Sequence, residues 1–132
     1  MADKELDKVI KAMTVFTETQ VINLSLDIHG ELIEETPVDT GWAQNNWQLG
    51  VASSPQGTLG SPENVDTSGP NAGVPNILSW KISKGPIYIT NNVPYILPLN
   101  AGHSKKAPKG FIEKTVKEEI KKAETISRGF KR

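Results

Sequence analysis

Apolar positions recur with a helical period through the first quarter of the chain. Between positions 3 and 35, a stripe with intervals of three and four residues runs through Leu6, Ile10, Met13, Thr17, Val21, Leu24, Ile28 and Leu32. Such spacing lines one face of an α-helix. Asp3 is a good N-cap residue, and Pro37 disfavours helical geometry at Thr36. We therefore predict one long amphipathic helix over residues 3–35.

A second helical stripe lies near the C-terminus. Within residues 110–127 it runs through Ile112, Val116, Ile120, Ala123 and Ser127. Lysines crowd the later turns, where the helix dipole favours positive charge. This pattern predicts a second amphipathic helix.

Two short segments between these helices have the pattern of β-strands. Trp47, Leu49 and Val51 alternate with Gln48 and Gly50, which is typical of a half-buried strand. Residues 87–90 are β-branched and aromatic and predict a second strand. Residues 77–83 fit either a short helix or a strand, and the alternation of their apolar residues favours the strand.

Residues 52–76 break this regular pattern. They are dense in Gly, Pro, Ser and Asn and carry very few apolar side chains. Burial of such a segment offsets little of its ordering entropy. We predict a long irregular loop, which is either a tolerated surface insertion or an arm that becomes ordered against a neighbouring subunit.

Just before the first strand, Asp39 or Thr40 could cap a single helical turn at 42–46.

Together these elements predict a single α+β domain over residues 1–132. A small antiparallel sheet should lie between a long N-terminal helix and a C-terminal helix. The chain has no cysteine, which excludes disulfides and thiolate metal sites. Its N-terminus lacks the apolar stretch of a signal peptide. No apolar run approaches the roughly 20 residues needed to cross a bilayer, so we expect a soluble protein.

The net charge of zero conceals a marked asymmetry. Residues 1–41 hold nine acids against three lysines, and residues 101–132 hold ten bases against four acids. The two ends could attract each other within one fold, or they could meet between neighbouring subunits. Glu31, Glu34 and Glu35 oppose the dipole at the end of the first helix, so we expect basic neighbours there.

Few residues offer catalytic or metal-binding chemistry. Asp39-Thr40-Gly41 matches the short motif of aspartic proteases, but it follows an acidic helix end in place of an apolar strand. His29 and His103 are the only histidines, and neither has the three converging ligands of a metal site. No nucleophile elbow or phosphate-binding loop is present. We expect no catalytic residue, no bound metal and no cofactor.

Three clusters of residues, in order along the chain, are similar to motifs of one viral family. They are the segment 36–41 followed by Asn46 and Trp47, the strand and following turn at 87–95, and the loop 102–110. Their matching residues are Pro37, Asp39, Thr40, Gly41, Trp47, Asn91, Asn92, Pro94, Tyr95, Gly102, His103, Ser104, Ala107, Pro108 and Gly110. In these residues the chain resembles tail-completion and head–tail joining (neck) proteins, the minor tail-component family of long-tailed bacteriophages. It departs at Lys106, where the motif has glutamine, and at residues 97–100, which lack an acidic residue.

The resemblance implies a structural virion protein, made in the host bacterial cytoplasm and placed at the neck or the end of the tail. It implies a homo-oligomeric ring, expected to be hexameric, that joins or completes head and tail. Its partners would be tail-tube, tail-terminator or head-completion proteins, and DNA would pass through the ring without sequence-specific binding. A tail-assembly chaperone, or another non-structural binding module, is the alternative. Charged residues at the ends predict the subunit contacts: Glu31, Glu34, Glu35, Lys105, Lys106 and Lys109.

From the residues themselves we expect mainly structural roles. Gly41, Gly102 and Gly110 should adopt backbone conformations closed to other residues. Asn91 and Asn92 should satisfy backbone groups of a turn. Trp47 and Tyr95 should pack between the sheet and the helices.

Overall fold

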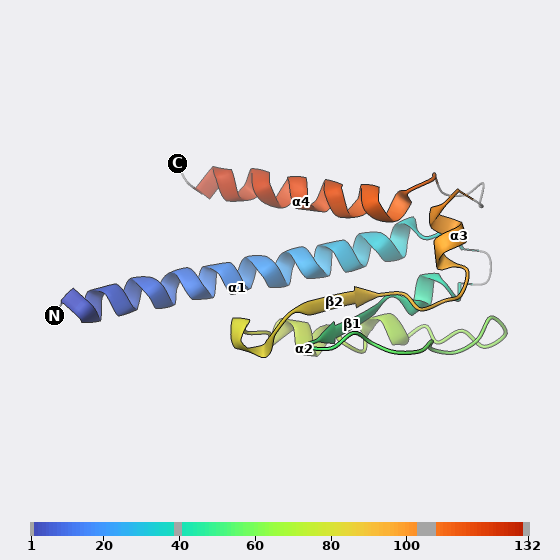
Figure 1. Ribbon diagram of the computed structural model, residues 1–132, viewed down its shortest axis with the longest axis horizontal. Coiled ribbons are helices and arrows are strands. Elements are labelled where there is room, and N and C mark those ends of the chain that lie inside the picture. The colour runs from blue at the N-terminus through green and yellow to red at the C-terminus, as the bar shows by residue number, and fades with distance from the viewer. Residues whose placement is uncertain (1, 39–40, 103–107, 131–132) are drawn as a thin grey trace.

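The computed structural model describes residues 2–38, 41–102 and 108–130, which form three layers (Figure 1). The long helix α1 (Ala2–Glu35) is the middle layer, and the C-terminal helix α4 (Phe111–Phe130) runs antiparallel along one side of it. Strands and short helices cover the other side. They are η1 (Gln44–Asn46), β1 (Gln48–Val51), η2 (Gly69–Asn71), α2 (Val74–Leu78), η3 (Ile82–Lys84), β2 (Ile87–Thr90) and α3 (Ile96–Asn100).

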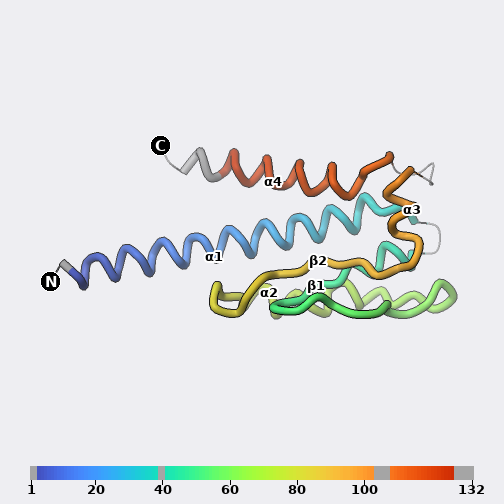
Figure 2. Tube along the Cα trace, viewed as in Figure 1, coloured from blue at the N-terminus to red at the C-terminus, as the bar shows by residue number. Residues whose placement is uncertain are grey.

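The predicted α+β class is confirmed, although the order of the layers differs from the prediction. β1 and β2 form a two-stranded antiparallel sheet in which Gln48 pairs with Thr90 and Val51 with Ile87. This sheet does not lie between the two long helices, because α4 packs on α1 and leaves the sheet on the opposite face of α1 (Figure 2).

The prediction of a long N-terminal helix is confirmed, but the prediction of Asp3 as its N-cap was wrong. α1 begins at Ala2, so Asp3 lies within the first turn, where the helix dipole still favours a carboxylate. The helix buries polar residues on one face: Glu18, Ser25 and His29 are buried along with Leu32. The predicted apolar stripe is covered only in its C-terminal half, and Leu6, Ile10 and Met13 are more than half exposed.

The core lies at the C-terminal end of α1. It is formed by Leu32, Ala43, Trp47, Val93, Ile96, Leu99 and Phe111, which come from four separate stretches of the chain. Ile28, Ile33, Trp42, Ile89 and Ile112 pack against it. One end of the molecule is therefore well packed, while the N-terminal half of α1 extends beyond the other elements (Figure 1).

The strand favoured for residues 77–83 was wrong. This stretch contains the end of α2 and the start of η3. Pro75 stands in the first turn of α2, where its missing N–H costs no hydrogen bond. The buried residues are Ile77 and Trp80, three residues apart as in a helical turn, whereas Leu78 is 60% exposed. Burial therefore does not follow the alternation that favoured a strand.

The segment 52–76 is irregular for most of its length, as predicted, but it is tied to the rest of the domain. Leu59 donates its N–H to Asn46 Oδ1 at 2.7 Å, and Asn46 Nδ2 donates to the Leu59 carbonyl at 3.0 Å. Gly69 and Pro70 of η2 are buried. Polar side chains from outside the segment thus supply contacts that its own apolar content does not.

The face that α4 buries differs from the predicted stripe. Among the α4 side chains that the structure describes, the buried ones are Phe111, Thr115 and Glu119, which repeat every four residues and face α1. Ile112 and Val116 of the stripe are only half-buried, and Ile120 is 40% exposed. The helix is therefore rotated so that part of its apolar stripe lies beside the contact with α1.

Candidate interaction surface

The first motif segment joins the end of α1 to the core. Thr36 donates its hydroxyl to the Leu32 carbonyl and accepts a hydrogen bond from Trp47 Nε1 at 2.7 Å. Thr36 and Pro37 are buried, as is Trp47, which is 4% exposed. Burial of Trp47 in the core is confirmed. This motif therefore fixes the direction in which the chain leaves α1.

The second motif segment connects three loops through its two asparagines. Asn91 Nδ2 donates to the Ala43 carbonyl at 2.9 Å, and Asn91 Oδ1 accepts from the Val93 N–H at 3.1 Å. Asn92 Nδ2 donates to the carbonyls of Pro55 and Gly57, both at 2.9 Å. The predicted capping of turn backbone groups is confirmed for Asn91, and Asn92 holds the 52–76 segment.

Tyr95, from the same motif, does not pack between the sheet and the helices. Its side chain is 37% exposed and lies against Trp42, with ring centroids 5.8 Å apart. Pro94 is exposed as well. The interior position next to them is taken by Ile96 of α3, which is buried.

The third motif leads into α4, and Asn100 caps that helix. Asn100 Oδ1 accepts the Ile112 N–H at 2.9 Å, and the Asn100 carbonyl accepts the Gly110 N–H. Asn100 Nδ2 binds both Glu113 oxygens and is the largest cause of the lowered pKa of that carboxyl. The three predicted glycines have positive φ: Gly41 at 85°, Gly102 at 94° and Gly110 at 77°.

Several predicted residues lie outside the described ranges. They are Asp39, Thr40, His103, Ser104, Lys105, Lys106 and Ala107. The protease-like triplet, the helix caps offered at 39 and 40, and most of the basic loop belong to this group. Pro108 and Lys109 are described and exposed. The residue immediately before η1 is Ala43.

The acidic end of α1 has the basic neighbour that its charge predicts. Lys122 of α4 binds Glu119 at 3.1 Å. The pKa of Lys122 is raised, first by its hydrogen bond to Glu119 and then by the charges of Glu119, Glu31 and Glu118. Lys122 and Glu119 also line a shallow hollow with Glu31 and Glu34. At this place the acidic and basic ends of the chain meet within one fold.

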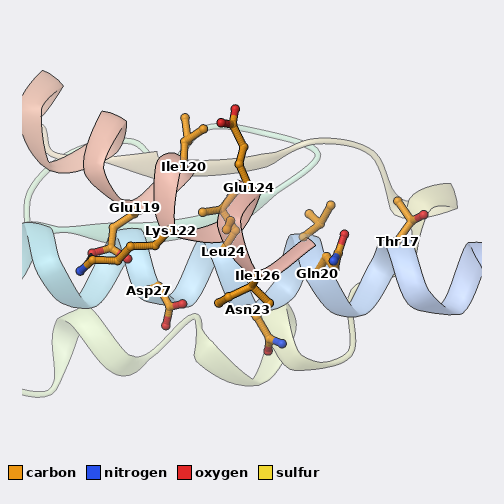
Figure 3. Close-up of a pocket in the computed structure, with 12 residues that line it drawn as sticks. Thr17, Gln20, Asn23, Leu24, Asp27, Glu119, Ile120, Lys122, Glu124 and Ile126 are labelled. Atoms are coloured by element: carbon orange, nitrogen blue, oxygen red, sulfur yellow. Dashed lines mark hydrogen bonds and ion pairs between the residues drawn. The ribbon is translucent and has the colours of Figure 1, made fainter. Parts of the chain in front are cut away.

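A groove separates α1 and α4 farther from the core. In Figure 1 the two helices diverge toward the C-terminal end of α4. The groove has a volume of about 440 Å³. Figure 3 shows its walls, one from each helix, and the side chains with apolar surface among them are Thr17, Val21, Leu24, Ile120, Ala123 and Ile126.

The exposed half of α1 continues the α1 wall of this groove. The exposed fractions are 58% for Leu6, 53% for Val9, 52% for Ile10 and 64% for Met13. The pattern of the chain identified this stripe, but it could not show that the fold leaves its first half uncovered. The groove was missed for the same reason, since it depends on how α4 is rotated against α1.

The buried side chain of His29 makes a structural hydrogen bond. His29 Nε2 donates to the Trp47 carbonyl at 2.9 Å, and burial lowers its pKa below 6.5 despite that hydrogen bond. No three His, Asp or Glu side chains in the described part of the chain are grouped so as to hold a metal. Nor is any helix there both long and apolar enough to cross a membrane.

Comparison of the chain with protein families, curated proteins and solved structures finds no match.

Proposed function

We propose that this protein is a structural virion component that forms a ring at the neck or tail end of a long-tailed phage. It would join or complete head and tail through protein–protein contacts, with no catalytic step. The proposal starts from the resemblance of three motif clusters to minor tail and neck proteins.

One observation carries the proposal. The first two clusters, which are far apart in the chain, meet in the core through the contacts of Thr36 with Trp47 and of Asn91 with Ala43. Gly110 of the third cluster donates its N–H to the Asn100 carbonyl, beside the start of α4. The clusters therefore lie in one packed unit, as a shared fold requires.

The exposed apolar stripe of α1 supports a role in assembly. Isolated apolar side chains on a surface are ordinary, but a continuous exposed stripe marks an interaction site. This stripe consists of Leu6, Val9, Ile10 and Met13. It lies on the half of α1 that extends beyond the other elements. A subunit whose apolar face is completed by a neighbour fits a ring component.

The experiment is to locate the protein in purified phage particles. Quantitative mass spectrometry should find a copy number per particle consistent with one ring, and antibody labelling in electron micrographs should mark the neck or the tail end. Deletion of the gene should leave heads and tails that do not join or complete. Absence from finished particles, with assembly still dependent on the gene, would replace this proposal by the assembly-chaperone alternative.

A further inference from the structure

We propose that the N-terminal half of α1, residues 2–16, docks in the groove between α1 and α4 of a second copy of this chain. The place of this contact in a ring rests on the proposed function. The contact adds to that function by identifying the two surfaces that neighbouring subunits use.

The groove has the shape and chemistry of a site for an apolar helix. Leu24 and Val21 of α1 form one wall, and Ile120, Ala123 and Ile126 of α4 contribute to the other (Figure 3). Ile126 is 59% exposed even though it lines the groove. Helices pack by inserting the ridges of one into the grooves of another, so a third helix can lie against these two.

The chain itself carries a helix of the required kind. The stripe of Leu6, Ile10 and Met13 has the same spacing as Val21 and Leu24 on the α1 wall, because both belong to one continuous face of the helix. The groove is lined along α1 from Thr17 to Asp27, about 15 Å at the helical rise. That length is sufficient for the stripe from Leu6 to Met13, which spans about 10 Å.

The exposed apolar area approaches the amount that a small specific interface needs. A large apolar residue exposes on the order of 200 Å² when free, so Leu6, Val9, Ile10 and Met13 with Ile120 and Ile126 expose on the order of 600 Å². The apolar share of a small specific interface is about 700 Å². The docking segment itself carries no net charge, because residues 2–16 hold three acids and three lysines.

The two surfaces are different parts of the molecule, and this allows two kinds of assembly. A contact between a projecting helix and a groove can be made reciprocally in a closed dimer, or it can run from each subunit to the next and leave one helix or groove unused at each end. Repetition of such a contact closes into a ring when the rotation per subunit allows it. Since the proposed function is a ring, we expect association to proceed beyond a dimer as the concentration rises.

The experiment uses the full chain and three sets of substitutions. Helix variants carry Ile10→Ser with Met13→Ser, and groove variants carry Ile120→Ser with Ile126→Ser. The matched control is Val15→Ser, because Val15 is 58% exposed but faces away from the stripe on the same helix. All these positions are exposed, and circular dichroism with thermal melting checks that each variant remains folded.

Size-exclusion chromatography with light scattering, across a concentration series, measures self-association. We expect the helix and groove variants each to weaken it by roughly tenfold or more, and Val15→Ser to leave it unchanged. A mixture of helix and groove variants retains one intact contact between two unlike subunits. It should form heterodimers and nothing larger, although neither variant associates alone.

Three outcomes would overturn the inference: a wild-type chain that is monomeric throughout the series, an equal effect of Val15→Ser, or groove variants that associate normally. These failures are distinct from failure of the proposed function. If the protein is present in virions but neither variant set changes its assembly, the proposed function stands and this contact is excluded. If the chain associates through this contact but is absent from virions, the contact stands and the proposed function is excluded.

Discussion

Trp47 donates its indole N–H to the hydroxyl oxygen of Thr36 at 2.7 Å, and both residues are buried. The Thr36 hydroxyl in turn donates to the Leu32 carbonyl in the last turn of α1. One hydroxyl group therefore connects the end of the long helix to the largest side chain of the core. It accepts one hydrogen bond and donates another, as a hydroxyl group can.

Replacement of Thr36 by valine keeps the shape of the side chain and removes the hydroxyl. The indole N–H of Trp47 is then buried without an acceptor. We expect Thr36→Val to lower the free energy of unfolding by about 1–3 kcal/mol, measured by urea denaturation. The control is Thr19→Val, because the Thr19 hydroxyl also donates to a carbonyl four residues earlier but is exposed. Equal stability of the two variants would contradict this role of Thr36.

Asn46 binds Leu59 of the 52–76 segment through two hydrogen bonds. Its side chain is fully buried, donates to the carbonyls of Trp42 and Leu59, and accepts the Leu59 N–H. Asn46→Ala should lower the free energy of unfolding by about 3 kcal/mol, since three hydrogen bonds of about 1 kcal/mol each are lost. Hydrogen exchange should show faster exchange of the Leu59 amide. Gln56→Ala serves as the control, because Gln56 is exposed and bonds only within the segment. Unchanged protection of the Leu59 amide in Asn46→Ala would exclude this role.

His29 should make the stability of the fold depend on pH. Burial lowers its pKa below 6.5, more than the hydrogen bond to the Trp47 carbonyl raises it. Below about pH 6.5 the unfolded chain therefore binds more protons than the folded chain. The contribution of His29 is fully present above that pH and is lost as the pH falls through it.

The measurement is urea denaturation at about pH 7.5 and about pH 5.5, on either side of the ordinary histidine pKa. His29→Gln keeps an N–H donor near the Trp47 carbonyl and cannot titrate, so the loss of stability between these two values should shrink. His103→Gln subtracts the titration of the other histidine. A pH dependence that is the same in His29→Gln and in the wild type would show that His29 is not its source.

Ionic strength separates two ways in which copies could associate. Docking of an apolar helix in an apolar groove should persist or strengthen as salt rises, because salt does not screen hydrophobic contacts. Association through the acidic and basic ends of the chain should weaken above about 0.15 M, where the Debye length is about 8 Å. Light scattering across a sodium chloride series distinguishes these. Clear dissociation at high salt would favour a contact between the charged ends.

The pattern of the sequence predicted the elements whose cause is local. The period of three and four residues located α1 and α4, and the β-branched run located β2 at residues 87–90. Pro37 was predicted to end the first helix, and the last residue of α1 is Glu35. Gly41, Gly102 and Gly110 have the positive φ expected of them. In each case the deciding interaction involves only neighbouring residues.

Other features depended on contacts between distant residues. The carboxylate of Glu18 accepts the Ile82 N–H at 2.7 Å, 64 residues away, and this explains a buried acid that no periodicity would place inside. Lys81 lies 4.0 Å from the same carboxylate. Similarly, apolar and polar residues alternate over 77–83 as in a strand. The buried residues are nevertheless Ile77 and Trp80, which are three positions apart as in a helical turn.

By itself, the sequence determined where α1, α4 and the two strands lie, the α+β class and the amphipathic character of the two long helices. Only the tertiary structure decided which faces of those helices are covered. Hydrophobic spacing sets the conformation of a segment, but the face that is buried depends on what packs against it. Here α1 places polar Glu18 and His29 against the sheet layer, and α4 turns Thr115 and Glu119 toward α1. The apolar surface that remains uncovered is the one to which we assign the subunit contact.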